Sequence, residues 1–285
     1  MSSEYRVAVG YNGTLFGFEE SFDPTWTTWY LRNYWYHSVL ASFVYVLLLY
    51  LGQVVMASRQ PFAVQSWLRI WNYSLAAFST MGAIRMSQEL YHVLSNHGFV
   101  ASVCLINIAD SFVAYWCEKF TYSKLLELGD TAFLVLRKRP VTFLHWYHHV
   151  TVMVYTWHAV KDHTTSGRWF IWMNFCVHSI MYTYYALMSS GWRLPKRVAA
   201  CVTTLQISQM VAGCVIVYTV YTQKAAGLYC HQSMQSLYLC FVMYFTYFLL
   251  FLRYFYKAYL SRSSAKSVPQ SQKHMAVNGN KAKDE

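Results

Sequence analysis

Residues 37–56 read HSVLASFVYVLLLYLGQVVM, a run of 20 residues without Asp, Glu, Lys or Arg. A helix needs about 20 apolar residues to cross the hydrocarbon core of a bilayer, so this run predicts a transmembrane helix. Six further apolar runs follow, near residues 68–89, 110–136, 142–160, 168–190, 198–222 and 236–259. The sequence therefore predicts an all-α integral membrane protein with seven transmembrane helices.

The third run is the least apolar, because it contains Glu118, Lys119, Lys124, Glu127 and Asp130. Omitting it would leave six helices. The distribution of positive charge favours seven, because lysine and arginine are retained on the cytoplasmic side during membrane insertion.

With seven spans, basic residues divide fourteen to five between the two sides. One side would carry Arg59, Arg69, Arg137, Lys138, Arg139, Arg193, Lys196, Arg197, Lys257, Arg262, Lys266, Lys273, Lys281 and Lys283. The other would carry Arg6, Arg32, Lys161, Arg168 and Lys224. This asymmetry predicts a lumenal N-terminus and a cytosolic C-terminus.

Composition supports a membrane protein, since 56% of the 285 residues are hydrophobic and 12% are charged. The net charge of +11 falls in short clusters between apolar runs, which argues against a nucleic-acid partner. No cleavable signal peptide is apparent in residues 1–36. We expect a lumenal segment at 1–36, a membrane domain at 37–259 and a disordered cytosolic tail at 260–285.

Short motifs in the segments outside the predicted spans suggest in which compartment the protein resides. Lys281 and Lys283 fit a K-x-K-x-x signal, which retains membrane proteins in the endoplasmic reticulum, although a merely solvated tail would look similar. Asn12 begins a glycosylation sequon on the predicted lumenal side. Cys104 and Cys230 fall in predicted lumenal loops, where an oxidising compartment would favour a disulfide. The other five cysteines lie within predicted spans, where they would pack as small apolar residues.

Ionisable side chains inside a bilayer are functional candidates, with interhelical pairing as the alternative. The strongest cluster is His145, His148 and His149, because residues three and four apart share one helical face. A second stripe, on the antiparallel run 168–190, comprises Asn174, His178, Tyr182 and Tyr185. At the predicted depths His178 faces His148 across a cavity.

Two more clusters are ambiguous. Lys124, Glu127, Asp130 and Thr131 could form an ion-pair network that holds the bundle, or could tune proton affinities beside the histidines. Gln206 and Gln209 could donate hydrogen bonds to a thioester or carboxylate, or could be packing amides.

Three classes of function compete for these residues. Membrane di-iron oxidases carry about eight histidines in three boxes, whereas this chain has one H-x-x-H-H box plus His178. Four imidazoles could still hold one zinc, so a metal is disfavoured and not excluded. A transporter or receptor would not need clustered imidazoles, and no internal repeat is visible. Metal-independent acyl chemistry remains, with imidazole as base or nucleophile toward a thioester.

Four motifs resemble those of the elongases of very-long-chain fatty acids, and the resemblance covers nearly all of the membrane region. K-x-x-E-x-x-D-T matches residues 124–131, H-x-x-H-H matches 145–149, H-x-x-M-Y-x-Y-Y matches 178–185 and T-L-Q-x-x-Q matches 204–209. Trp146 and Tyr147 within the box resemble the branch that prefers saturated and monounsaturated chains.

The resemblance implies that spans two to seven form a barrel around a tunnel, open to the cytosol and closed at the lumenal end. It implies a 3-oxoacyl-CoA synthase of the endoplasmic reticulum membrane. An acyl group would pass from long-chain acyl-CoA to His148, with His178 as partner, and decarboxylating malonyl-CoA would then attack. His145 and His149 would orient the site or manage protons. The implied substrate-binding residues are Lys124, Glu127, Asp130, Asn174, Tyr182, Tyr185, Gln206 and Gln209.

This chemistry implies no metal and no cofactor beyond the substrates acyl-CoA and malonyl-CoA. Implied partners in the bilayer are a 3-oxoacyl-CoA reductase, a 3-hydroxyacyl-CoA dehydratase and an enoyl-CoA reductase. Chain-length preference, homo-oligomerisation and the choice between nucleophile and base for His148 stay open.

Overall fold

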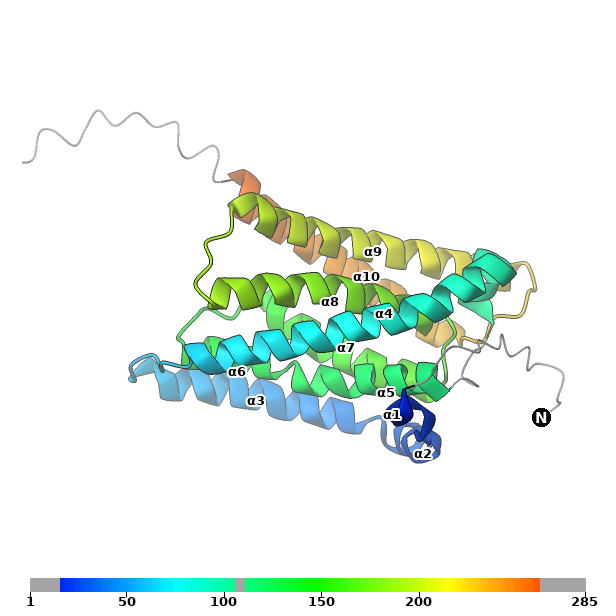
Figure 1. Cartoon of the computed structure of the whole chain (residues 1–285), viewed down its shortest axis with the longest axis horizontal. Helices are drawn as coiled ribbons and strands as arrows, with labels where there is room; N and C mark the ends of the chain where they lie inside the picture. Colours follow the sequence, from blue (N-terminus) through cyan, green and yellow to red (C-terminus); the bar gives the residue numbers. More distant parts are fainter. Residues whose placement is uncertain (1–15, 106–110, 262–285) are drawn as a thin grey trace, which may run out of the picture.

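The long helices run side by side along the longest axis of the molecule (Figure 1). This computed structural model describes residues 16–105 and 111–261, and every regular element in those ranges is helical. The elements are α1 Gly17–Glu20, α2 Thr25–Tyr34, α3 His37–Ala57, α4 Gln65–Cys104, α5 Ser111–Leu126, α6 Gly129–Leu136, α7 Phe143–Lys161, α8 Gly167–Ser189, α9 Lys196–Ala225, α10 Met234–Phe255 and the π-helical turn η2 Tyr256–Leu260.

Helices α3 to α10 lie over the seven apolar runs, with two differences. Helix α4 continues to Cys104, well past the expected end at residue 89. Two charged residues in the last part of this run are buried and paired: Arg85 with Glu19 at 2.5 Å, and Glu89 with Arg168 at 3.1 Å. Because these pairs satisfy the charges inside the protein, the helix need not stop there.

The third run is broken into α5 and α6. Residues 127 and 128 form a turn, in which the amide of Asp130 donates to the carbonyl of Glu127 at 3.1 Å. Trp71 of α4 packs against Gly129 just after the turn, where an added Cβ would lie 2.8 Å from the indole Cζ2. Glycine at this position therefore permits the close approach of α4 to α6.

In the part of the chain that the structure describes, three helices are long and apolar enough to cross a membrane: α3, α9, and α10 together with η2. Large apolar side chains are exposed on the outer surface; on α3, for example, these include Phe43, Leu48 and Tyr50. Among the described residues, seven charged side chains are instead buried in the interior, namely Glu19, Arg85, Glu89, Glu118, Lys124, Glu127 and Arg168. An apolar exterior around a charged interior is the arrangement of a helical membrane protein.

Helices α4 and α8 form the most extensive helix pair of the bundle. Gly82 of α4 lies against the ring of Phe175, which is itself buried in a cluster with Trp116 and Phe120 of α5. This packing fixes the face of α8 that turns toward α5 and α7, and that face carries Asn174 and His178.

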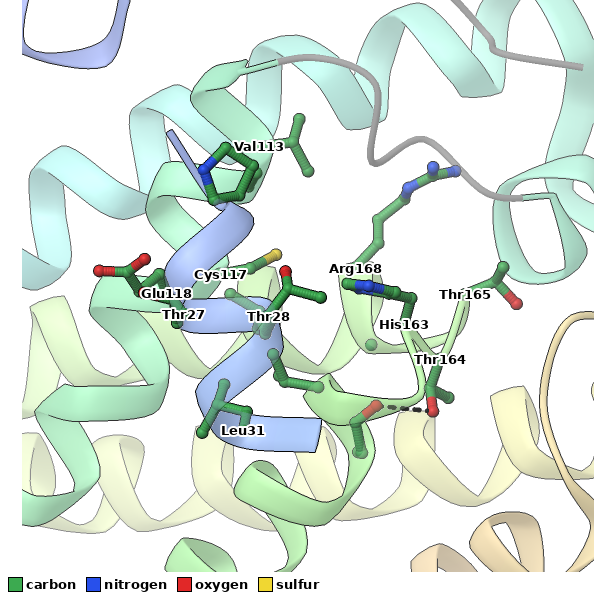
Figure 2. Close-up of a pocket in the computed structure, with 16 residues that line it drawn as sticks. Thr27, Thr28, Leu31, Val113, Cys117, Glu118, His163, Thr164, Thr165 and Arg168 are labelled. Atoms are coloured by element: carbon green, nitrogen blue, oxygen red, sulfur yellow. Dashed lines mark hydrogen bonds between the residues drawn. The ribbon is translucent and has the colours of Figure 1, made fainter. Parts of the chain in front are cut away.

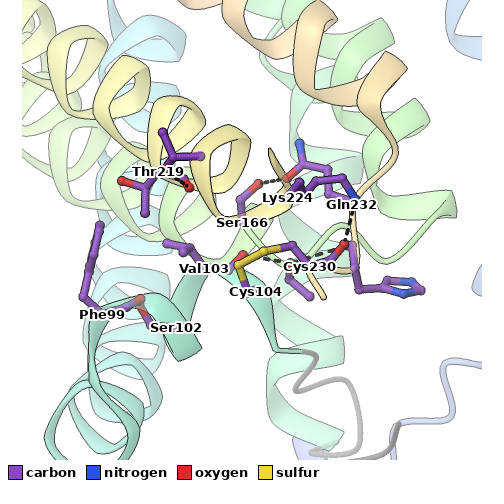
Figure 3. Close-up of a disulfide and its surroundings, with 12 residues drawn as sticks. Phe99, Ser102, Val103, Cys104, Ser166, Thr219, Lys224, Cys230 and Gln232 are labelled. Atoms are coloured by element: carbon purple, nitrogen blue, oxygen red, sulfur yellow. Dashed lines mark hydrogen bonds between the residues drawn. A yellow bond between two sulfur atoms is a disulfide. The ribbon is translucent and has the colours of Figure 1, made fainter. Parts of the chain in front are cut away.

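The predicted disulfide between Cys104 and Cys230 is present at one end of the bundle, which we call the disulfide end (Figure 3). Gly98, at φ +79°, interrupts α4 and redirects its last turn toward this bond. The α7–α8 connection joins the same assembly, because Thr165 donates to the Val103 carbonyl at 2.8 Å and Ser166 to Gln232 at 2.7 Å.

The other cysteines vary in burial: Cys240 is buried, Cys117, Cys176 and Cys214 are partly buried, and Cys201 is exposed. Cys201 differs from the packed position expected for it, because its face of α9 turns away from the bundle. Asn12, Lys281 and Lys283 lie outside the described residues, so the expectations for them stay untested.

Replacing both Cys104 and Cys230 by alanine should lower the free energy of unfolding by about 2–4 kcal/mol, because the bond closes a long loop. The bond spans 126 residues of sequence. A thermal melt in detergent would show the change as a fall of several degrees. Cys214→Ala is the matched control, since this partly buried cysteine has no disulfide. Equal melting temperatures for the double variant and the control would contradict the prediction.

Candidate active site

A closed ring of polar contacts lies between α5 and α8, and we call Lys124, Glu127, Asn174 and His178 the polar ring. Lys124 Nζ donates to Glu127 Oε1 at 2.7 Å and to Asn174 Oδ1 at 2.9 Å. Asn174 Nδ2 lies 3.1 Å from His178 Nε2, and His178 Nδ1 lies 3.9 Å from Glu127 Oε2. All four side chains are buried, so these contacts form in a region of low dielectric constant.

The contacts determine which way each group points. The ammonium of Lys124 can only donate, so Asn174 must present its oxygen to it. The amide nitrogen of Asn174 then faces His178, whose Nε2 must accept. The proton of the neutral imidazole consequently sits on Nδ1, facing Glu127 Oε2, an oxygen without a hydrogen-bond partner among the described residues. One buried cation thus sets the tautomer of a histidine on another helix.

Asp130 does not join the polar ring and instead connects α6 to α4 and α8. Trp71 Nε1 donates to Asp130 Oδ1 at 2.6 Å, and the Tyr182 hydroxyl donates to Asp130 Oδ2 at 2.7 Å. Both bonds depend on the turn before α6, which brings the carboxylate beside Trp71. The Asp130 carboxylate therefore fixes the position of Tyr182 one turn from His178.

The histidine box occupies the first two turns of α7, whose N-terminus is capped by Thr142. His145 Nε2 lies 2.8 Å from Thr131 Oγ1, and the hydroxyl of Tyr45 lies 2.7 Å from the same oxygen. His145 and His149 stack with ring centroids 4.5 Å apart. Helices α3 and α6 thus orient the first histidine of the box.

His148 lies toward α10, unlike the other two histidines. Its ring packs against Tyr247 with centroids 5.0 Å apart, and the Tyr247 hydroxyl donates to the His148 carbonyl at 3.3 Å. His148 is partly exposed, whereas His149 is buried with no partner for Nδ1 among the residues described. His148 is therefore the more accessible of this neighbouring pair.

A cavity of about 60 Å³ lies further along α7 and α8 toward the disulfide end; Asn174 lines it, whereas His148 and His178 do not. Its wall on α7 is the stripe Val152, Tyr155, Thr156 and Ala159, which extends the helical face of His148 by steps of three and four residues. Its wall on α8 is Gly167, Phe170, Ile171 and Asn174, which extends the face of His178 in the same way. Asn174 thus belongs both to the polar ring and to the cavity.

Gln206, Gln209 and Tyr185 lie outside both the polar ring and the histidine box. Gln206 donates to the sulfur of Met181 at 3.3 Å, and Gln209 is buried beside Tyr244, which lines the cavity. Tyr185 is 43% exposed, with its ring 6.4 Å from that of Tyr182. Sequence spacing placed these residues on the right helices but did not identify their neighbours.

Sequence reasoning missed Tyr45, Trp71 and Tyr247, which hold Thr131, Asp130 and His148. Aromatic residues make up 19% of the chain, so no single one carries a signal. Among residues 16–105 and 111–261, no group of three or more His, Cys, Asp or Glu side chains is placed to hold a metal ion.

Comparison with known proteins relates the chain to fatty acid elongases. Residues 30–267 match the model of the family described as ELO, GNS1/SUR4. A Caenorhabditis elegans protein named as a fatty acid elongase is 52% identical over 249 residues, covering 87% of this chain and 78% of that protein. Very long chain fatty acid elongase 6 of Drosophila melanogaster is 43% identical, covering 89% of this chain and 81% of the relative. Very long chain fatty acid elongase 3 of Homo sapiens is 42% identical, covering 85% and 90%.

Replacing only Lys124 or only Glu127 by an apolar residue should destabilise the protein more than replacing both. Lys124→Met or Glu127→Leu alone would leave an uncompensated buried charge, with an expected loss of about 3–5 kcal/mol, whereas the double variant should regain most of this. Thermal melts of the four proteins in detergent measure the difference.

Lys161→Met is the matched control, because Lys161 also pairs with a neighbouring acid, but this partner, Asp162, is 40% exposed. It should change stability by less than about 1 kcal/mol. Additive losses in the double variant would show that the buried charges do not depend on each other.

Proposed function

This chain belongs to the ELO, GNS1/SUR4 family and takes part in fatty acid elongation, and from that premise we propose that it is the condensing enzyme. It joins a long-chain acyl-CoA to malonyl-CoA and releases a 3-oxoacyl-CoA two carbons longer, with loss of carbon dioxide. The other activities of the cycle belong to partners that reduce, dehydrate and again reduce this product.

The observation that carries the proposal is the alignment of the histidines with an apolar cavity. The helical faces that bear His148 on α7 and His178 on α8 line the cavity further along each helix, toward the disulfide end. A thioester at the histidines would leave its hydrocarbon chain in the cavity and its CoA on the opposite side. That geometry suits a substrate with one apolar and one highly charged part.

The first step is acyl transfer to His148. A ring nitrogen with a free electron pair attacks the thioester carbonyl, the carbon–sulfur bond breaks, and the thiolate of CoA takes the proton released from the imidazole. The polar ring supports this step by holding His178 and Asn174 beside the reacting carbonyl, to which the second N–H of the Asn174 amide donates a hydrogen bond, while the Tyr182 hydroxyl stays bonded to Asp130. Fixed donors stabilise developing negative charge because they need not reorganise.

The second step uses malonyl-CoA as the carbon nucleophile. Loss of carbon dioxide leaves its bonding electron pair on the adjacent carbon, which attacks the acyl carbonyl and displaces His148. The imidazole regains its proton, so the balance is acyl-CoA, malonyl-CoA and one proton giving 3-oxoacyl-CoA, carbon dioxide and CoA. Decarboxylation supplies the carbanion, so we expect no metal or redox cofactor.

The remaining predicted residues act around this centre. His145 and His149 orient the box, and Gln206 and Gln209 hold the malonyl or thioester groups from α9. Lys124, Glu127 and Asp130 position the donors, and Tyr185 lies at the exposed end of the α8 stripe. These assignments rest on the family motifs.

We also propose that all seven helical segments cross the membrane of the endoplasmic reticulum, with α4 to α10 as a barrel around the acyl tunnel. The disulfide end faces the lumen, because disulfides persist in oxidising compartments. The basic connections at the opposite end face the cytosol. Lys281 and Lys283 act in retrieval, and Asn12 is a glycosylation site.

The test is to incubate the purified protein with palmitoyl-CoA alone and to measure its intact mass. One added acyl chain per protein is expected, and it should be absent from His148→Ala, which should also lower condensation by on the order of 10³-fold or more. His158→Ala is the matched control, because His158 lies on the same helix near the disulfide end and packs on Trp35.

Other results would change the assignment in defined ways. A 3-oxoacyl-CoA product without any adduct would make His148 a base in a direct condensation. Stoichiometric iron without a condensation product would reject the synthase and favour a di-iron oxidase.

A further inference from the structure

A second cavity, of about 90 Å³, lies under α2 at the disulfide end (Figure 2). Thr27, Thr28 and Leu31 of α2 and Val113 of α5 line one side of it, and the α7–α8 connection with His163 lines the other. It does not touch the polar ring or the histidine box.

The two cavities share a thin wall, which we call the partition. Five residues line both of them: Ala159, Val160, Thr164, Gly167 and Ile171. Three of the five have small side chains or none. An added Cβ at Gly167 would meet no atom within 4 Å, so the partition is thinnest at the first residue of α8.

The distance from His148 to the partition sets the number of carbons with which an extended acyl chain reaches the partition. His148 and Ala159 are 11 residues apart on α7, which is about 16 Å along the helix. With C–C bonds of about 1.5 Å set in a zigzag, that path holds roughly 12 to 14 carbons. Longer acyl chains must go past the partition.

The lining of the second cavity is compatible with hydrocarbon. Burial, followed by the nearby charge of Arg32, lowers the pKa of His163, so its ring is neutral near pH 7. The charged residues in the wall are paired elsewhere, Arg168 with Glu89 and Glu118 with Lys119. A molecule bound in this cavity therefore does not need a charged group to neutralise Arg168 or Glu118.

We propose that the cavity under α2 is a second acyl-binding compartment, which receives the methyl end of chains longer than about 14 carbons through the partition. The inference rests on the proposed condensation, because it takes His148 as the origin of the chain. Helix α2, which precedes the first apolar run, thereby becomes part of the substrate site, and the partition separates short from long substrates.

The first test adds a bulky side chain to the partition, so that an acyl chain can no longer pass it. Gly167→Leu should lower the ratio of stearoyl-CoA to dodecanoyl-CoA elongation by at least about tenfold, the effect of losing two buried CH₂ groups. Gly17→Leu is the matched control, because Gly17 is also the first residue of a helix with open space at its Cβ, yet lies outside both cavities. An unchanged ratio in Gly167→Leu would overturn the proposal.

A second variant fills the compartment from the opposite side. Thr28 lines only the cavity under α2, so Thr28→Leu should produce the same loss with stearoyl-CoA while dodecanoyl-CoA is elongated normally. Equal losses with both substrates would assign the residue to folding and would contradict a length-selective compartment.

Photolabelling tests occupancy independently of turnover. Stearoyl-CoA with a diazirine at its methyl end should label residues 25–34, whereas the dodecanoyl analogue should label the partition and not α2. Labelling of α2 by a photoactive phosphatidylcholine but not by stearoyl-CoA would make the cavity a lipid site and overturn the proposal. Labelling of α2 by stearoyl-CoA without any 3-oxoacyl-CoA product would instead reject the proposed function and keep the compartment.

Discussion

The buried ammonium of Lys124 is the constraint from which the arrangement of the site follows. A charge with 1% exposure must be paired, and the partners come from the end of α5 and from α8. Glu127 neutralises it, Asn174 turns its oxygen toward it, and His178 receives its orientation from Asn174. The break between α5 and α6 follows the same requirement, since the turn at residue 127 keeps the carboxylate beside the ammonium while α6 changes direction.

Hydrophobic length was sufficient to locate the helices but not their ends. The apolar runs predicted helices where α3 and α7 to α10 begin and end within a few residues. The continuation of α4 from residue 89 to Cys104 was not predicted, and neither was the pairing of Arg85 and Glu89, because their partners Glu19 and Arg168 are distant in sequence. Local patterns carry no information about such long-range pairing, and the turn at residue 127 was invisible for the same reason.

Helical spacing was equally informative about the site within single helices. It placed Asn174 and His178 together on α8. It predicted one face for His145, His148 and His149, of which His145 and His149 stack whereas His148 turns toward Tyr247 of α10. It could not join Lys124 to Asn174, because their contact depends on how α5 packs against α8. The supporting aromatic residues were also hidden, since Trp71 and Tyr45 act through one hydrogen bond each in a chain rich in aromatic residues.

The disulfide has a consequence for biosynthesis in the proposed orientation. Cys104 enters the lumen early, and its partner follows 126 residues later, once α9 has been inserted. During that interval Cys104 is a free thiol in an oxidising compartment, accessible to thiol-dependent retention. A chain that stops within α9 lacks Cys230 and cannot form the bond, so a single covalent link shows that synthesis has passed the α9–α10 connection.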